Sequence, residues 1–292
     1  MKQKTGMDKL DSLTQAQAGS SESGASNVDL AVVSDLEIQN AQLRPFEGGF
    51  QEGSPYKAYM DRFKALHVPD YVIGDAQRNY VVQDTHLVFH HLKGGRYNRQ
   101  MYSMQPLGEI EVKLIEGFKE WAKEQGVTIP EWTLDQNNYA LRYISSYRED
   151  YQKTYDYLME HQNWMINDVP KVFEQEEKWI NILKSGMMYG MGRDKYQRPV
   201  FYLHMKRVIE MKLNLEELIG YSDYFNSYVI ANAMVPGRVE QYVLIFDLKD
   251  VSIFDFPVSD IVEFSRHGTV NYKQRNGMSL YVNVPWMFRL AI

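Results

Sequence analysis

The chain has 292 residues, of which 44% are hydrophobic and 24% charged, and 38 acidic against 32 basic side chains give a formal net charge of -6. These values are typical of a globular protein with one large or two modest domains, and they argue against nucleic-acid binding through a broad basic face. Because cysteine is absent, disulfides, thiolate zinc sites and cysteine nucleophiles are excluded.

Residues 1–30 are rich in Ser, Gly, Ala and Gln. Such a segment buries too little apolar surface to offset the entropy of ordering, so the sequence predicts a disordered tail. The N-terminus carries no apolar stretch of the kind found in secretory signals, and no segment reaches the roughly 18 apolar residues needed to span a bilayer. We therefore expect a cytoplasmic protein that can contact a membrane peripherally.

Residues 31–130 form an N-terminal region to which the sequence assigns no role. Apolar spacing predicts a helix over 56–66, and alternation predicts strands within 70–92 on either side of a turn at Gly74-Asp75. A further apolar stripe predicts an amphipathic helix over 107–125 that ends at Gly126.

Residues 131–185 are expected to form a helical module, with helices over 138–147, 150–163 and 172–183. Two short strands, 187–191 and 200–204, should follow and be joined by a turn.

The last part of the chain alternates strands with helices. A helix is expected to start at Asn214, whose side chain can form a capping box with Glu217. The remaining expected elements are a strand over 241–246, a helix over 257–272 and a strand over 280–284. This order predicts an α/β fold with a mostly parallel sheet covered by helices, preceded by the helical module.

Two clusters of side chains could form reactive sites. His86, His90 and His91 could suggest a metal, but on a strand His86 and His90 would lie about 13 Å apart, so neither a metal site nor a cofactor is expected. Asp247, Asp250 and Asp255 follow a strand end, where α/β enzymes often carry catalytic carboxylates. Asp250 and Asp255 are equally explained as turn and helix-cap residues, and no nucleophile or phosphate-binding motif accompanies the cluster, so no catalytic residue is expected.

Four motifs in the second half carry a family resemblance. They are Leu141-Arg142-Tyr143-Ile144, with Asp150 and Trp164 bounding the next helix; Asp194-Lys195-Tyr196-Gln197-Arg198-Pro199-Val200; Ile245-Phe246-Asp247-Leu248-Lys249; and Tyr281-Val282-Asn283-Val284-Pro285-Trp286-Met287-Phe288. In this order and spacing, residues 135–292 resemble the CRAL-TRIO family, which includes transfer proteins for phosphatidylinositol, tocopherol and retinaldehyde.

The resemblance implies that one lipid binds in a deep apolar cavity with a sheet as its floor, helices as its walls and a mobile gate helix. By the family pattern, Tyr242, Leu244 and Phe246 should face the cavity, while Val243 and Ile245 should pack against covering helices. The residues expected to contact the ligand are Tyr202, Leu218, Phe225, Tyr228, Tyr242, Leu244, Phe246, Gln274 and Trp286.

The sequence also departs from the family pattern. Members that bind phosphatidylinositol carry small hydroxyl residues at the positions of Tyr242 and Leu244, an acidic residue at Gln274 and a basic one at Ser145, so inositol-lipid selectivity is not expected. Gln197 stands where the family prefers glycine, so its backbone must adopt a glycine-like conformation. The domain expected over 186–292 is incomplete at its C-terminus relative to the family, because the gate helix has no sequence here.

The sequence therefore predicts a non-enzymatic protein that binds a single hydrophobic lipid or other small hydrophobic ligand and transfers it between membranes through transient contact with their surfaces. The alternative is a scaffold that kept the fold, lost the pocket and binds a protein partner. A lipid hydrolase that uses the region of Asp247 is a more distant alternative.

Overall fold

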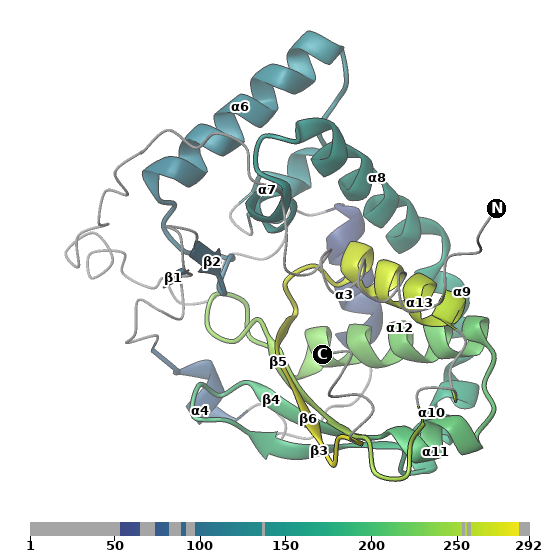
Figure 1. Ribbon diagram of the computed structural model, residues 1–292. Helices are drawn as coiled ribbons and strands as arrows, with labels where there is room; N and C mark the ends of the chain where they lie inside the picture. Colours follow the sequence, from purple (N-terminus) through teal and green to yellow (C-terminus); the bar gives the residue numbers. More distant parts are fainter. Residues whose placement is uncertain are drawn as a thin grey trace, which may run out of the picture.

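The computed structural model describes residues 53–64, 74–81, 89–91, 97–135, 138–252, 255 and 258–285. A four-stranded sheet carries two long helices on one face, and helices from the first half of the chain pack beyond them (Figure 1). This is the α/β fold with a mostly parallel sheet that the sequence predicts.

The sheet has the strand order β3-β4-β5-β6. Its strands are β3 (Met188–Arg193), β4 (Pro199–His204), β5 (Tyr242–Asp247) and β6 (Asn276–Val282). The first two strands form an antiparallel hairpin, and β4, β5 and β6 run parallel to one another. The two expected hairpin strands and the expected parallel pairing are thus confirmed.

The parallel strands are joined by helices that lie on the same face of the sheet. The chain passes from β4 to β5 through α11 (Met205–Glu210) and α12 (Leu215–Asn232), and from β5 to β6 through α13 (Val258–Asn271). Both connections step in the same direction across the sheet, and because parallel connections are right-handed, both long helices lie on one side (Figure 1).

The opposite, outer face of the sheet differs from expectation. Pairing across the strands aligns Tyr189, Tyr202, Ile245 and Leu280 in one row on that face. Tyr189 and Leu280 are 45% and 43% exposed, so the described elements leave the ends of the row open to solvent. The expectation that helices cover this face is therefore wrong for the described part of the chain, because the helices of both crossover connections lie on the other face.

The start of α12 confirms its predicted capping box. Asn214 Oδ1 accepts a hydrogen bond from the Glu217 N–H at 2.9 Å, and Glu217 Oε2 accepts one from the Asn214 N–H at 3.1 Å. These contacts satisfy two backbone donors that the first helical turn cannot pair internally. The helix ends at Asn232.

The turn between β3 and β4 is organised by Asp194. Asp194 Oδ1 accepts from the N–H groups of Tyr196 and Arg198, both at 2.9 Å, and Arg198 Nε donates to Asp194 Oδ2 at 2.7 Å. These bonds hold Gln197 at a φ of +62°, the left-handed conformation that glycine adopts most easily. The backbone does adopt the glycine-like conformation that the sequence requires.

The first half of the chain is mainly helical. Its described elements are α3 (Pro55–Lys64), α4 (Asp75–Arg78), short strands β1 (Phe89–His91) and β2 (Tyr97–Arg99), α6 (Glu109–Gln125), a 3₁₀ turn (Glu131–Thr133), α7 (Leu141–Tyr147), α8 (Tyr151–Asn167), α9 (Val169–Glu174) and α10 (Glu176–Lys184). The helices expected over 56–66, 107–125, 138–147 and 150–163 are confirmed. The helix expected over 172–183 is interrupted at Gln175. Helix α4 lies at the expected turn after Gly74, and residues 70–73 and 82–88 of the segment expected to contain strands lie outside the described residues.

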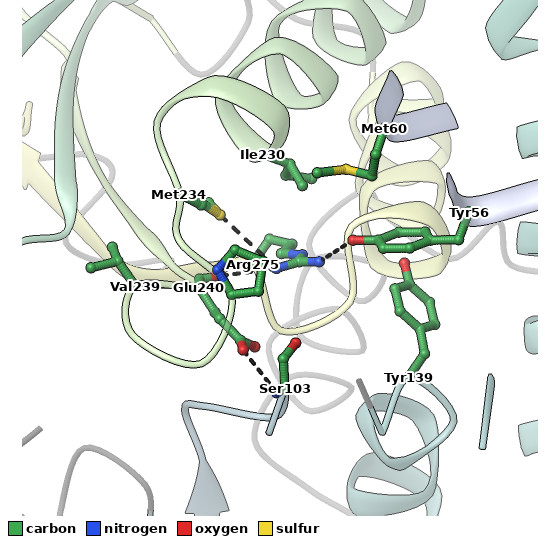
Figure 2. A pocket seen from close by; sticks show the side chains of 10 residues that line it. Tyr56, Met60, Ser103, Tyr139, Ile230, Met234, Val239, Glu240 and Arg275 are labelled. Atoms are coloured by element: carbon green, nitrogen blue, oxygen red, sulfur yellow. Dashed lines mark hydrogen bonds between the residues drawn. The ribbon is translucent and has the colours of Figure 1, made fainter. Parts of the chain in front are cut away.

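Residues upstream of 131 share one core with the sheet domain. Tyr56, on α3, accepts a hydrogen bond from Arg275 Nη2 at 2.7 Å, and Glu240 Oε1 accepts one from the Ser103 N–H at 2.8 Å (Figure 2). Glu240 also pairs with buried Arg142 of α7. The void between these side chains is only about 10 Å³, room for a water molecule and not for a ligand, so this junction is structural.

Candidate functional site

A cavity of about 880 Å³ lies between the inner face of the sheet and the helices α11, α12 and α13. Its floor consists of alternate side chains from all four strands, namely Met188, Leu203, Tyr242, Leu244, Phe246 and Tyr281. Only every second residue of a strand reaches the floor, because successive side chains of a strand point to opposite faces of the sheet. The floor is therefore mainly apolar.

The walls of the cavity are also largely apolar. Helix α11 contributes Met205, Val208 and Ile209; α12 contributes Leu218, Tyr221 and Phe225; and α13 contributes Ile261, Phe264 and Gly268. A mainly apolar cavity of several hundred cubic ångströms with a few polar groups is typical of sites that bind small hydrophobic molecules.

Six of the nine residues expected to contact a ligand line this cavity. They are Leu218, Phe225, Tyr242, Leu244, Phe246 and Gln274. Trp286 lies outside the described residues. Whether the six contact a bound molecule stays a prediction.

Two of the expected residues, Tyr202 and Tyr228, do not line the cavity. Tyr202 pairs with Ile245 on the outer face of the sheet, where its ring stacks on Tyr189 at a centroid distance of 5.5 Å. Tyr228 lies on α12, in its last two turns, and is likewise not part of the lining. Placing these two tyrosines in the cavity was therefore wrong.

The sequence interpretation missed the contribution of α11. Met205, Val208 and Ile209 follow the i, i+3, i+4 spacing of an apolar helix face, so a signal was present. The helix has only six residues and directly follows a strand, and so short an apolar pattern does not separate helix from strand.

None of the charged residues of the lining is buried. Lys212 and Asp255 are exposed, and Asp260 and Lys273 are half-buried. The neutral polar residues Tyr221 and Asn226 also line the cavity but are buried.

Lys273 lies where α13 leads into β6. Its ammonium donates to Tyr147 Oη at 3.3 Å and lies 4.6 Å from the centre of the Tyr147 ring, and Lys153 approaches the same ring at 4.8 Å. Burial, with a smaller effect of the positive charge of Lys153, lowers the pKa of Lys273 to about 8. The next residue, Gln274, donates to Ser146 Oγ at 3.4 Å, so this corner of the cavity is joined to α7.

The wall helix α13 is tied to the core through a buried carboxylate. Asp223 of α12 accepts from Trp164 Nε1 at 3.1 Å and from the Tyr272 hydroxyl at 2.8 Å, and its Oδ1 lies 2.6 Å from His267 Nε2. Asn271, at the end of α13, lies 3.4 Å from His161 Nδ1 through its Oδ1 atom. Burial is the main reason that the pKa of His161 is lowered to about 3.

Asp247, at the end of β5, and Asp250 and Asp255 beyond it do not assemble a site in the cavity. Asp247 alternates with Phe246 and therefore faces the outer side, where it accepts from the Tyr202 hydroxyl at 2.9 Å and from Asn283 Nδ2 at 2.7 Å. Burial alone would raise the pKa of Asp247. The opposite effect is larger, because these hydrogen bonds, another from the Lys249 N–H and the nearby His204 all stabilise the carboxylate, so the pKa is lowered overall. Asp250 lies in a turn with a φ of +58°, and Asp255 accepts from the Ser252 N–H at 2.8 Å, which matches their interpretation as turn residues.

The histidine cluster is described only in part. His86 lies outside the described residues, and His90 and His91 are described only as part of β1. Across the described ranges, no group of three His, Asp or Glu side chains could hold a metal ion.

A sheet floor, helical walls and an apolar cavity are together typical of a site for a small hydrophobic molecule. Residues 183–292 match the CRAL/TRIO domain family, and proteins of that family in general bind or transfer lipids. Among solved structures, the crystal structure of Sfh5 is similar, with a TM-score of 0.38 and 15% sequence identity over 63% of this chain and 74% of that chain. No curated protein sequence matches the chain. None of the helices in the described ranges is long and apolar enough to cross a membrane.

Proposed function

We propose that the protein binds a single lipid in the cavity between the sheet and helices α11 to α13, and that it carries this lipid between membranes. The observation that supports the proposal most strongly is an apolar cavity of about 880 Å³ in the part of the chain that matches the CRAL/TRIO domain family. The alternative, a scaffold that lost its pocket, predicts an interior filled by its own side chains, so the volume of the cavity favours lipid binding.

The energetics of exchange follow from the lining. Moving an acyl chain from water into an apolar cavity gains about 0.8 kcal/mol per CH₂ group. For transfer of the same chain from a bilayer into the cavity the gain in free energy nearly vanishes, because both environments are apolar. Selectivity and rate of exchange must therefore come from the few polar contacts in the cavity and from the cost of opening its wall.

The cavity has an exposed rim between α13 and β6. Phe264 and Tyr281 both line the cavity, yet they are 38% and 52% exposed. Large apolar side chains at an opening can enter the apolar part of a membrane while a lipid passes. We assign this rim as the entry route and expect a cytoplasmic protein that contacts membranes transiently.

The test uses the intact chain purified from a lipid-containing host. Native mass spectrometry should show one bound lipid per chain, and the protein should take up a fluorescent phosphatidylcholine from vesicles. A protein that is empty and takes up no lipid would refute the proposal.

A blocking variant links uptake to the cavity. Gly268 lines the cavity, and a Cβ added there would meet nothing within 4 Å, so Gly268→Trp should fold while its indole fills part of the volume. Val262, on the same helix, is 39% exposed and does not line the cavity, so Val262→Trp is the matched control. We expect uptake to fall at least tenfold in Gly268→Trp and to stay unchanged in Val262→Trp. Equal uptake by both variants would place the lipid elsewhere.

A further inference from the structure

Helix α11 separates its apolar residues from its charged ones. The apolar residues line the cavity, whereas the charged residues, Lys206, Arg207 and Glu210, are exposed and do not line it. Lys212, two residues beyond the end of the helix, is exposed and also lines the cavity. The outer side of α11 is therefore a charged surface that reaches the mouth of the cavity.

The C-terminal end of α10 adjoins this surface. Arg207 Nη1 donates to the backbone oxygens of Ser185 and Gly186 at 3.2 and 3.1 Å, and the two helices lie side by side (Figure 1). These bonds satisfy carbonyls that the end of a helix cannot pair internally. Lys184 is the last residue of α10 and is exposed, so a third lysine belongs to the same surface.

The lysines of this surface are not neutralised by carboxylates of the described residues. None of Lys184, Lys206 and Lys212 forms an ion pair there, and neither does Glu210. The pattern differs on the helices before α11, where Lys171 pairs with Asp168 at 2.9 Å and Lys178 with Glu217 at 3.1 Å. Four cations and one acid leave a local positive excess on a chain whose formal net charge is -6.

Exposed apolar side chains occupy the same mouth. Ile261, Phe264 and Tyr281 line the cavity together with Lys212, and all four are exposed, so they surround one opening. Lysines beside exposed large apolar residues are typical of surfaces that bind anionic membranes, because the apolar groups enter the interface while the ammonium groups meet the headgroups.

We propose that Lys184, Lys206, Arg207 and Lys212, called here the α11 cluster, dock on the anionic surface of a membrane and so turn the mouth of the cavity toward the bilayer. This inference rests on the proposed function, because it names the membrane surface at which lipid exchange takes place. The exposed apolar side chains at the mouth favour a bilayer over an acidic protein, because only a bilayer offers them an apolar phase.

The test measures binding to vesicles and not lipid uptake. The intact chain is mixed with vesicles of phosphatidylcholine, or of equal parts phosphatidylcholine and phosphatidylserine, and the bound fraction is measured by sedimentation. One cation near an anionic surface strengthens binding about fivefold, so the excess charge should give the mixed vesicles a preference of at least about tenfold. The preference should disappear at about 1 M salt, where charges are screened within about 3 Å.

Variants of opposite sign locate the binding surface. Lys206→Glu should weaken binding to mixed vesicles about twentyfold, and Glu210→Lys should strengthen it by a similar factor, because each changes the charge by two units. The gain in Glu210→Lys cannot arise from misfolding. The matched controls are Lys123→Glu and Glu124→Lys, both exposed on α6 at the other end of the molecule, and they should leave binding unchanged (Figure 1).

The outcomes separate this inference from the proposed function. Equal binding of the two kinds of vesicle would overturn the inference, as would equal effects of the α11 and α6 variants. Uptake of fluorescent phosphatidylcholine from neutral vesicles would then leave the proposed function intact. Preferential binding to mixed vesicles without uptake of any lipid would refute the proposed function and still support the α11 cluster as a membrane-binding surface.

Discussion

Asp223 is the residue whose loss should do most to loosen the wall of the cavity. It is 3% exposed and connects α12 to Trp164 of α8 and to His267 and Tyr272 at the end of α13. In Asp223→Asn the size is kept, but the charge is lost and an NH₂ group takes the place of one acceptor oxygen. At least one of the three partners then faces a donor.

The cost follows from the number of contacts. Hydrogen bonds to a charged group contribute about 1.5–3 kcal/mol each, roughly twice the value for neutral pairs, and a buried donor left without an acceptor adds a penalty of similar size. Halving three such bonds should by itself lower the free energy of unfolding by about 2–4 kcal/mol, and the buried donor left without an acceptor should lower it further.

Urea unfolding followed by fluorescence measures this loss, and α13 supplies its own control. Arg266 of α13 makes an exposed ion pair with Glu160 of α8 at 2.7 Å, with side-chain exposures of 47% and 40%. An exposed pair contributes little, so Glu160→Gln should cost at most about 1 kcal/mol. Equal losses in Asp223→Asn and Glu160→Gln would refute the claim that the buried carboxylate anchors the helix.

Three further predictions concern packing and titration. Gly220→Ala should destabilise the protein by about 1–3 kcal/mol, because the added Cβ would lie 2.6 Å from Trp179 Cη2. Gly268→Ala should stabilise the protein by about 0.5–1 kcal/mol, because alanine favours the helix and its Cβ meets nothing within 4 Å. Similar urea midpoints for the two variants would contradict this packing. The folded-state pKa of His161 is about 3 against an ordinary 6.5, so the unfolded chain binds the extra proton and stability falls as the pH drops below about 6.5. His161→Gln should flatten that fall between pH 7 and 5, and an unchanged slope would count against it. The pKa of Lys273 is about 8 in the folded protein against an ordinary 10.5. Below pH 8 its positive charge therefore lowers the free energy of unfolding by up to about 3 kcal/mol, and this loss disappears as the pH rises toward 10.5. Lys273→Met should therefore be more stable than the wild type at pH 7 and lose that advantage by pH 10.5, whereas a pH-independent difference would refute the titration.

The elements that the sequence predicted best are those whose signals are local. Asn214 and Glu217 are three residues apart, and their reciprocal capping depends on nothing distant, so the start of α12 was predictable to the residue. The inward set on β5, Tyr242, Leu244 and Phe246, follows from alternation once one member is placed.

The errors arise where tertiary placement decides. Tyr202 is one position out of step with the cavity-facing residues of β4, and on a strand one position reverses the face. The outer face of the sheet was expected to be covered, but only strand order reveals that both crossovers step the same way. The side-chain oxygens of Tyr221 and Asn226 have no hydrogen-bond partner among the described residues, which could not be predicted, because a missing partner is visible only when all neighbours are in place.

The two ends of α13 differ in how they are held, and this difference bears on how a lipid enters. The described contacts that fix the helix, from Arg266, His267 and Asn271, all lie in its C-terminal half. Ile261 and Phe264, in the N-terminal half, line the cavity and are 43% and 38% exposed. A displacement confined to the N-terminal half would widen the rim without breaking any of those anchoring bonds. On the proposed entry route, passage of a lipid past Phe264 would therefore require less free energy than release of the whole helix. Asp223→Asn loosens the anchored half as well, so it should speed lipid loss by letting the whole helix move and not by changing the cavity lining.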